Sequence, residues 1–234
     1  MAADSQARLP ARRALRSSSD SILIVGNSFT SGIKNRLRHL AHSAGRDVFV
    51  GVCAGDGYTL AAHAASPRTL AKIHSNDWRT VILQEQSDGI SAERYQGART
   101  LDGEIDGHTV FFMTWRDRGA DLADYDTLRG EPGGDTGYVP IAFELDAAVA
   151  PIGWAFREIL LAEPDADLWS RDGHHASERG RYIAALVLFA TIYGESPVGL
   201  WMSPSLDEEQ SFADQLLVEQ VVLTNPALWN IAVP

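Results

Sequence analysis

Two short segments near opposite ends of the chain contain a serine, a histidine and an aspartate. Ser28 lies in Gly26-Asn27-Ser28-Phe29-Thr30, directly after the apolar run 22–25. Asp172 and His175 lie in Asp172-Gly173-His174-His175, directly before a long apolar segment. Serine hydrolysis needs a nucleophile, a base that takes its proton and a carboxylate that orients the base. If the fold brings the two segments together, they predict a hydrolase.

The segment around Ser28 also fits other interpretations. Serine is a favoured N-cap, and on this segment alone the capping role is favoured over a catalytic one. A helix that began at Ser28 would offer free backbone N–H groups and a partial positive charge to an oxyanion. A phosphate-binding loop is disfavoured, because the segment has neither the lysine of a P-loop nor the third glycine of a dinucleotide-binding fingerprint.

The second segment is the more specific of the two. Because Asp172 and His175 are three positions apart, the Asp172 carboxylate can fold back onto Nδ1 of His175, so that Nε2 faces Ser28. His174 is an adjacent competitor whose other interpretation is a solvent-facing or supporting residue. A metal site is disfavoured because adjacent histidines point in different directions and no further ligand cluster is evident. We therefore predict no metal and no organic cofactor.

The hydropathy pattern alternates strands with helices. Strands are expected at 22–25, 47–52, 80–83, 109–114 and 149–152, and helices at 33–41, 59–65, 154–161, 177–193 and 207–223. This alternation predicts an α/β protein with a parallel sheet covered on both faces. Ligand sites in such sheets lie beyond the carboxyl ends of the strands, which is where the two segments fall.

The segment 116–137 is polar and contains Gly130, Gly133 and Gly134. It is expected to form a long loop near the carboxyl end of the sheet. A surface excursion and a lid or substrate loop are equally favoured for it.

Length and composition indicate one globular domain. The chain has 234 residues, and we expect a disordered leader at 1–19 followed by a single domain at 20–234. A net charge of −11 argues against binding to nucleic acid or to anionic membranes. We expect Cys53, the single cysteine, to be a buried small side chain rather than a nucleophile.

No apolar stretch approaches the roughly 20 residues of a membrane span. The arginine-containing leader lacks the apolar core of a signal peptide, so the default expectation is a cytoplasmic protein. The oligomeric state is left open by the sequence.

The two end segments resemble the SGNH, or GDSL-like, hydrolase superfamily. Gly26-Asn27-Ser28-Phe29 is similar to its first block, with Asn for the usual Asp and Phe for the usual Leu. Asp172-Gly173-His174-His175-Ala176-Ser177, followed by Gly180 and Tyr182, is similar to its last block. The resemblance covers about 21–199 and implies a flavodoxin-like three-layer α/β/α sandwich with a mostly parallel sheet of roughly five strands. It assigns Ser28 as nucleophile, His175 as base and Asp172 as orienting acid.

The chain matches the two middle sequence blocks of the superfamily less completely. The resemblance implies an oxyanion hole formed by the Ser28 N–H, by a glycine N–H and by an Asn side chain in a Gly-x-Asn-Asp motif. Gly57 is our choice over Gly55 for the glycine. The chain lacks the Gly-x-Asn-Asp motif, and Gln84, with Gln86 as the alternative, takes the place of its asparagine.

The segment Leu83-Gln84-Glu85-Gln86-Ser87 resembles a branch of SGNH-like proteins of unestablished function, which also has a strand that ends in Thr-Trp, as Thr114-Trp115 does here. Trp115 and Gln86 are candidate substrate-binding residues, although core packing is the favoured interpretation of Trp115. Glu85 is interpreted as a solvated surface residue in preference to a site carboxylate.

Together these observations predict a serine esterase that acts on a small ester, such as an acetyl or short acyl group on a carbohydrate, through an acyl-enzyme. The expected partner is therefore a small-molecule ester substrate. The alternatives are a thioesterase or lysophospholipase with the same triad, and a catalytically degenerate SGNH domain that binds a glycan.

Overall fold

A computed structural model describes residues 20–86 and 89–231, so the expected leader at 1–19 lies outside the described residues. Its centre is one five-stranded sheet in which every neighbouring pair is parallel. The strands lie in the order β2-β1-β3-β4-β5, and they are β1 (Asp20–Gly26), β2 (Val48–Ala54), β3 (Thr80–Gln84), β4 (His108–Phe112) and β5 (Ala148–Ala150). This confirms the predicted α/β class and parallel sheet.

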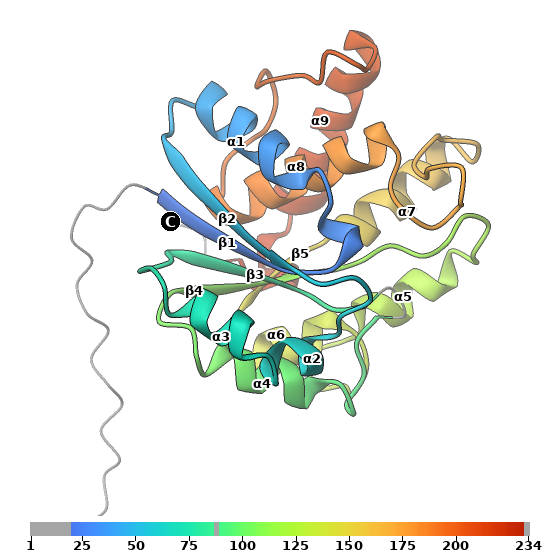
Figure 1. Ribbon diagram of the computed structural model, residues 1–234. Helices are drawn as coiled ribbons and strands as arrows, with labels where there is room; N and C mark the ends of the chain where they lie inside the picture. The colour runs from blue at the N-terminus through green and yellow to red at the C-terminus, as the bar shows by residue number, and fades with distance from the viewer. Residues whose placement is uncertain (1–19, 87–88, 232–234) are drawn as a thin grey trace, which may run out of the picture.

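Helices cover both faces of the sheet (Figure 1). One side carries α1 (Ile33–Ser43), α7 (Ile152–Ala162), α8 (Glu178–Tyr193) and, packed against α8, α9 (Glu208–Leu223). The other side carries α2 (Leu60–Ala64), α3 (Pro67–Ile73), α4 (Tyr95–Asp102) and α6 (Tyr138–Glu144). The remaining elements are α5 (Ala123–Arg129) and two 3-10 turns, η1 (Ser28–Thr30) and η2 (Pro226–Trp229). The result is the three-layer sandwich that the resemblance implies.

The central strands are buried on both faces, which is why they appear in the sequence as continuous apolar runs. All five residues of β3 are buried, whereas the edge strand β2 alternates and exposes Phe49 and Val52. Helix α8 is apolar on nearly all sides and lies between the sheet, α1, α7 and α9. This long buried helix fixes the position of the segment that precedes it, which contains Asp172 and His175.

The carboxyl ends of β1 and β3 form the switch point of the sheet. From β1 the chain crosses to β2 through α1 on one face, and from β2 it reaches β3 through α2 and α3 on the other face. Because the two connections leave in opposite directions, an open sheet of this kind leaves a crevice between these two strand ends. Ser28 follows β1 directly, and Gln84 ends β3.

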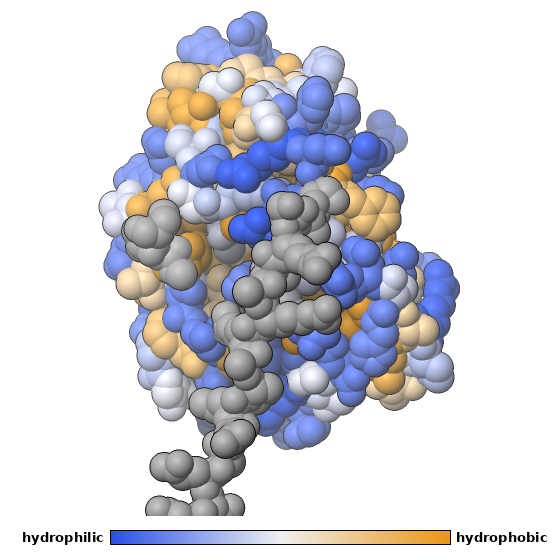
Figure 2. Space-filling view, turned by 90° about the vertical axis from the view of Figure 1, so that its left-hand side faces the viewer, coloured by the Kyte–Doolittle hydropathy of each residue, from blue (hydrophilic) through white to orange (hydrophobic). Residues whose placement is uncertain are grey.

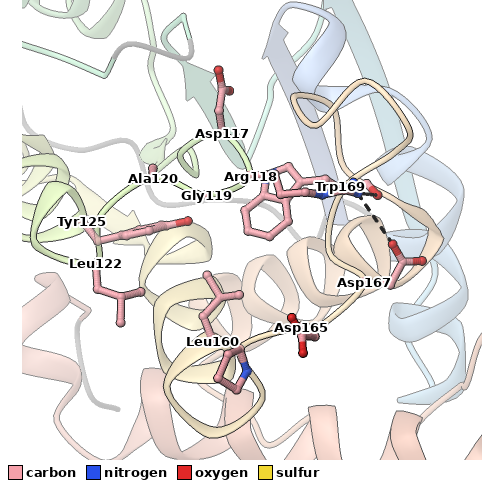
Figure 3. Close-up of a pocket in the computed structure, with 12 residues that line it drawn as sticks. Asp117, Arg118, Gly119, Ala120, Leu122, Tyr125, Leu160, Asp165, Asp167 and Trp169 are labelled. Atoms are coloured by element: carbon pink, nitrogen blue, oxygen red, sulfur yellow. Dashed lines mark hydrogen bonds and ion pairs between the residues drawn. The ribbon is translucent and has the colours of Figure 1, made fainter.

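The prediction of a continuous loop at 116–137 was wrong, because this segment contains α5. Tyr125 and Leu128, three positions apart, are the buried residues of this helix, which ends before Gly130. Gly130 and Gly137 both have positive φ and lie against each other, since a Cβ on Gly137 would come 2.5 Å from the Gly130 nitrogen. Residues 117–120, Leu122 and Tyr125 line a cavity (Figure 3).

No helix in the described part of the chain has the length and apolarity to cross a membrane. On the face that carries the amino ends of the strands, hydrophilic and hydrophobic residues are interspersed (Figure 2). Cys53 is buried as predicted, next to the Thr69 hydroxyl.

Candidate active site

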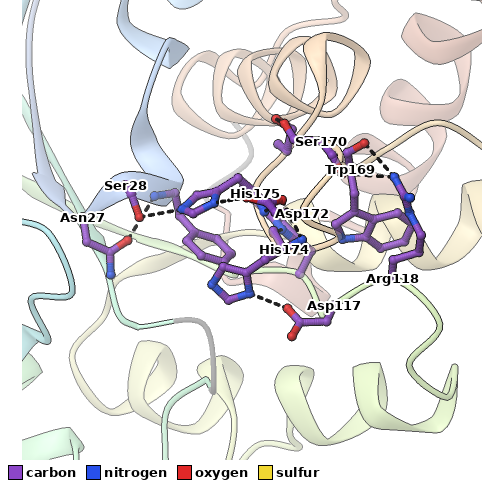
Figure 4. Close-up of polar contacts among 12 residues, drawn as sticks. Asn27, Ser28, Asp117, Arg118, Trp169, Ser170, Asp172, His174 and His175 are labelled. Carbon is purple, nitrogen blue, oxygen red and sulfur yellow. Dashed lines mark hydrogen bonds and ion pairs between the residues drawn. The ribbon is translucent and has the colours of Figure 1, made fainter.

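The structure brings Ser28 into contact with His175, 147 positions further along the chain. Ser28 Oγ lies 2.9 Å from Nε2 of His175 (Figure 4). The interpretation of Ser28 as a helix cap is wrong, because Asn27 is the residue that caps η1, through Oδ1 and the Phe29 N–H at 3.1 Å. An α-helix does not begin at Ser28 either. Ser28 opens a 3-10 turn of three residues, and α1 begins only at Ile33, so a helix dipole does not act on Ser28.

Asp172 holds the other side of the His175 ring. Its Oδ2 lies 2.7 Å from Nδ1 of His175, and its Oδ1 accepts the backbone N–H groups of His174 and His175 at 3.0 Å each. The hydrogen bond from His175, followed by the one from the His174 N–H, holds the pKa of the Asp172 carboxyl well below its usual range. An ionised Asp172 favours the tautomer with a proton on Nδ1, which leaves Nε2 free to accept the serine proton.

His174, the competitor for the role of base, points elsewhere. Its Nδ1 lies 2.6 Å from Oδ1 of Asp117, and its ring packs edge-on against Phe29. The two histidine rings are perpendicular, with centroids 5.0 Å apart. Asp117 was not singled out by sequence reasoning, because the pairing joins a loop after β4 to one before α8 and leaves no local pattern.

Two N–H groups near Ser28 have no hydrogen-bond partner among the described residues, those of Ser28 itself and of Gly57. The Gly55 N–H, in contrast, is bonded to the Gly26 carbonyl oxygen at 3.1 Å. Gly57 has a φ of 68°, and the side-chain amide of Asn27 donates to the carbonyl of the next residue, Tyr58, at 3.1 Å. The loop with Gly57 is thus fixed to the turn with Ser28, and the free N–H favours Gly57 over Gly55.

Gln84 lies beneath the turn rather than in the open site. Its side chain is fully buried; Oε1 accepts the Asn27 N–H at 2.7 Å, and Nε2 donates to the Glu85 carbonyl oxygen. The amide that the sequence assigns to the oxyanion is therefore bound to the backbone of its neighbours. Gln86, the alternative, is half-buried, so its side chain is not enclosed as that of Gln84 is.

Glu85 was predicted to be a solvated surface residue, and this prediction is wrong. It is fully buried, and its carboxylate accepts the N–H of Leu60 at 3.2 Å and of Gln86 at 2.7 Å. Glu85 therefore joins the end of β3 to the first turn of α2.

Trp115 cannot stack on a substrate, because its side chain is fully buried. Its ring stacks between Phe29 at 4.7 Å and Phe156 at 5.1 Å, and its indole N–H donates to the His174 carbonyl oxygen at 2.9 Å. The candidate role in substrate binding is thus replaced by a supporting one, in which Trp115 holds both the serine turn and the histidine loop.

A buried histidine that sequence reasoning did not assign to the site supports the same turn. His63 in α2 is 1% exposed, with Nε2 at 2.9 Å from the Gly26 carbonyl oxygen and Nδ1 at 2.9 Å from the Thr69 hydroxyl. Burial lowers the pKa of His63, so the ring is held in its neutral form.

Gly180 and Tyr182, the other residues of the last block, hold α8 in place. A Cβ on Gly180 would lie 2.4 Å from the Leu168 carbonyl oxygen, so only glycine allows this close approach. The Tyr182 hydroxyl accepts from Gln215 in α9 at 2.9 Å. No group of three or more potential metal ligands is found in the described part of the chain.

No protein-family model matches this sequence, and no curated protein matches it significantly. Solved structures do match. A DUF4886 family protein from Bacteroides uniformis aligns with a TM-score of 0.70 and 17% identity, over 88% of this chain and 95% of that chain. A proposed SGNH hydrolase from Slackia heliotrinireducens aligns with a TM-score of 0.57 and 26% identity, over 75% of this chain and 100% of that chain. The esterase EstA from Pseudoalteromonas sp. aligns with a TM-score of 0.55 and 12% identity, over 75% and 98% of the two chains.

Proposed function

We propose that this chain, which is related to the SGNH hydrolase superfamily, is a serine esterase that hydrolyses small esters, with acetyl or short acyl groups on a carbohydrate as the substrate class. The observation that supports it best is the continuous hydrogen-bonded series from Ser28 Oγ to His175 Nε2 at 2.9 Å and from His175 Nδ1 to Asp172 Oδ2 at 2.7 Å. A degenerate, purely glycan-binding domain would have no need to keep all three groups in this arrangement.

In the proposed reaction, Ser28 Oγ attacks the ester carbonyl carbon while His175 Nε2 takes the hydroxyl proton. The tetrahedral intermediate collapses, the bond to the alcohol oxygen breaks, and His175 returns the proton to the leaving alkoxide. Water then attacks the acyl-enzyme with His175 again as base, which releases the acid and regenerates Ser28. Asp172 orients the imidazole and stabilises its protonated form.

The negative charge on the carbonyl oxygen is stabilised in this proposal by the N–H groups of Ser28 and Gly57 and by the Gln86 amide. Support comes from the absence of partners for the two N–H groups within the described residues and from the burial of the competing amide of Gln84. Each such donor contributes about 10²–10³ in rate in serine hydrolases.

Two glutamine variants separate structural support from catalysis. Gln84→Met leaves the buried Asn27 N–H without an acceptor, and we expect it to lower the free energy of unfolding by about 1–3 kcal/mol. Gln86→Met is expected to change the stability by less than about 0.5 kcal/mol and to lower kcat for p-nitrophenyl acetate by about 10²-fold. Urea unfolding and initial rates measure the two effects. Full activity of Gln86→Met would remove Gln86 from the oxyanion hole.

The acyl specificity is tested by kcat/KM across p-nitrophenyl acetate, butyrate, octanoate and palmitate. We expect acetate to be the best substrate and octanoate to be at least about tenfold poorer, because a pocket formed for a short chain excludes extra methylenes. The Ser28→Ala variant provides the background rate for each ester. A steep preference for octanoate or palmitate would instead assign the chain to the thioesterase or lysophospholipase class.

A further inference from the structure

A second pair of a histidine and a carboxylate lies beside the triad. Nδ1 of His174 is 2.6 Å from Oδ1 of Asp117, and the two side chains are 38% and 65% exposed. The proposed reaction uses neither residue. Because exposed pairs of this kind contribute little to the free energy of unfolding, the stability of the fold does not account for the pair.

His174 adjoins the reacting groups without bonding to Ser28. Its ring packs edge-on against Phe29, the residue after Ser28, with 4.9 Å between the ring centroids, and lies perpendicular to the ring of His175 at 5.0 Å. The backbone of His174 is held as well, since its carbonyl oxygen accepts the Trp115 indole N–H at 2.9 Å. His174 therefore forms part of the wall of the same site.

Asp117 determines which nitrogen of His174 can accept a hydrogen bond. A carboxylate has no proton to donate, so Nδ1 carries the proton of the neutral ring and Nε2 keeps its lone pair. Within the described part of the chain, Nε2 has no hydrogen-bond partner and is not closed off from solvent. It faces away from Asp117, toward the side on which Asn27 and Ser28 lie (Figure 4). His174 thus offers an accessible acceptor beside the reacting groups.

The position of this acceptor determines which part of an ester it meets. His175 Nε2 must reach the leaving oxygen in order to protonate it, so the alcohol part of the ester lies on the histidine side of Ser28. Because the rings of His174 and His175 are in contact, a group that meets His174 must lie close to the leaving oxygen. In the acylated carbohydrates of the proposed substrate class, the donor at this position is the hydroxyl group on the next carbon.

We infer that His174, with its tautomer fixed by Asp117, accepts a hydrogen bond from a hydroxyl group on the carbon next to the ester-bearing carbon of the alcohol. His174 is then a specificity-determining residue that selects esters of vicinal diols and sugars over esters of simple alcohols. It takes no part in the bond-breaking steps. The inference rests on the proposed esterase function.

The kinetic test compares two acetyl esters, the monoacetate of ethane-1,2-diol and the acetate of 2-methoxyethanol, at about pH 8, above the range in which histidine usually titrates. The second ester carries a methyl group in place of the hydroxyl hydrogen, so it cannot donate. We expect the wild-type protein to prefer the first ester roughly 3- to 10-fold in kcat/KM, the effect of one hydrogen bond.

His174→Phe keeps an aromatic ring against Phe29 and removes the acceptor. It is expected to bring the ratio of the two kcat/KM values to about 1, because neither ester then has a partner for its terminal oxygen. The ratio is the informative quantity, since any effect of the substitution on the adjacent base changes both rates alike and cancels.

His74→Phe is the matched control. His74 forms the same kind of exposed pair, with Nε2 at 2.9 Å from Oε2 of Glu104, but it lies between α3 and the start of β3, at the opposite edge of the sheet from Ser28. This variant should retain the wild-type ratio and the wild-type rate on p-nitrophenyl acetate. In both variants Tm should stay within about 4 °C of the wild-type value.

The tautomer can be measured without turnover, by long-range ¹H–¹⁵N NMR correlation at about pH 8. The signals of His174 are identified by their loss in His174→Phe. We expect Nδ1 to be protonated and Nε2 to be unprotonated.

The inference is overturned if the wild-type protein does not distinguish the two esters, if His174→Phe retains the preference, or if Nε2 of His174 carries the proton. The wild-type rate on p-nitrophenyl acetate, whose alcohol has no such hydroxyl, separates this result from a failure of the proposed function. Turnover of p-nitrophenyl acetate without a preference between the two esters removes only the role of His174. A folded protein that hydrolyses none of the three esters removes the proposed function and this inference with it.

Discussion

Ser28→Ala is expected to lower the rate of p-nitrophenyl acetate hydrolysis by at least about 10⁴-fold, to the level given by binding and the oxyanion hole alone. The reason is that Oγ, the atom removed, is the group that forms the covalent bond to the acyl carbon. Initial rates at saturating ester, with the uncatalysed rate subtracted, measure the effect.

The fold should survive this change. Asn27, not Ser28, caps η1. The Ser28 Oγ is hydrogen-bonded to His175, which takes part in the proposed reaction. Ser31→Ala, an exposed serine at the end of the same turn, is the matched control and should retain its activity. A folded Ser28→Ala protein with undiminished turnover would show that Ser28 is not the nucleophile.

Asp172→Asn is expected to lower kcat by about 10⁴-fold while leaving the fold intact. The Asn carbonyl oxygen can still accept the N–H groups of His174 and His175, but its amide would face Nδ1 as a donor. The imidazole would then carry its proton on Nε2, which prevents it from accepting the serine proton. Asp207→Asn, at the cap of α9, makes the same chemical change far from the loop and should have no effect on kcat.

The pH dependence follows from the same carboxylate. The pKa of Asp172 is lowered in the folded protein, chiefly by the hydrogen bond from His175, so Asp172 stays ionised as the pH falls to its usual value of 3.8. The acid limb of the kcat profile should therefore not report titration of Asp172. The stability contributed by this group is present above its usual pKa of 3.8 and is lost only as the pH falls below that value.

Much of the fold could be predicted from the sequence because the strands of a doubly covered parallel sheet are apolar throughout. The runs at 22–25 and 80–83 both lie within observed strands, β1 and β3. The helices α3, α4, α5 and α6 were not predicted; they have seven or eight residues each, about two turns of pattern, although the five-residue α2 was predicted. In α5, the buried positions are only Tyr125 and Leu128, in a segment otherwise polar and rich in glycine.

The site residues could be predicted only where their spacing along the sequence determines how close they lie in the folded chain. Asp172 and His175 are three positions apart and are hydrogen-bonded to each other. Ser28 reaches His175 because β1 ends, and α8 begins, at the same edge of the sheet. The orientation of Gln84, in contrast, depends on the neighbouring strand and could not be inferred, since every residue of β3 is buried and no alternation distinguishes its faces. The burial of Trp115 agrees with the favoured interpretation, but its ring partners Phe29 and Phe156 are distant in sequence and could not be inferred.

The central claim, that Ser28 is a nucleophile activated by His175 and Asp172, is tested most directly by labelling with a fluorophosphonate probe followed by intact-protein and peptide mass spectrometry. One adduct per chain, located on Ser28, absent in Ser28→Ala and formed much more slowly in Asp172→Asn, is the predicted result. A folded wild-type protein that forms no adduct, or forms it on a residue other than Ser28, would contradict the account.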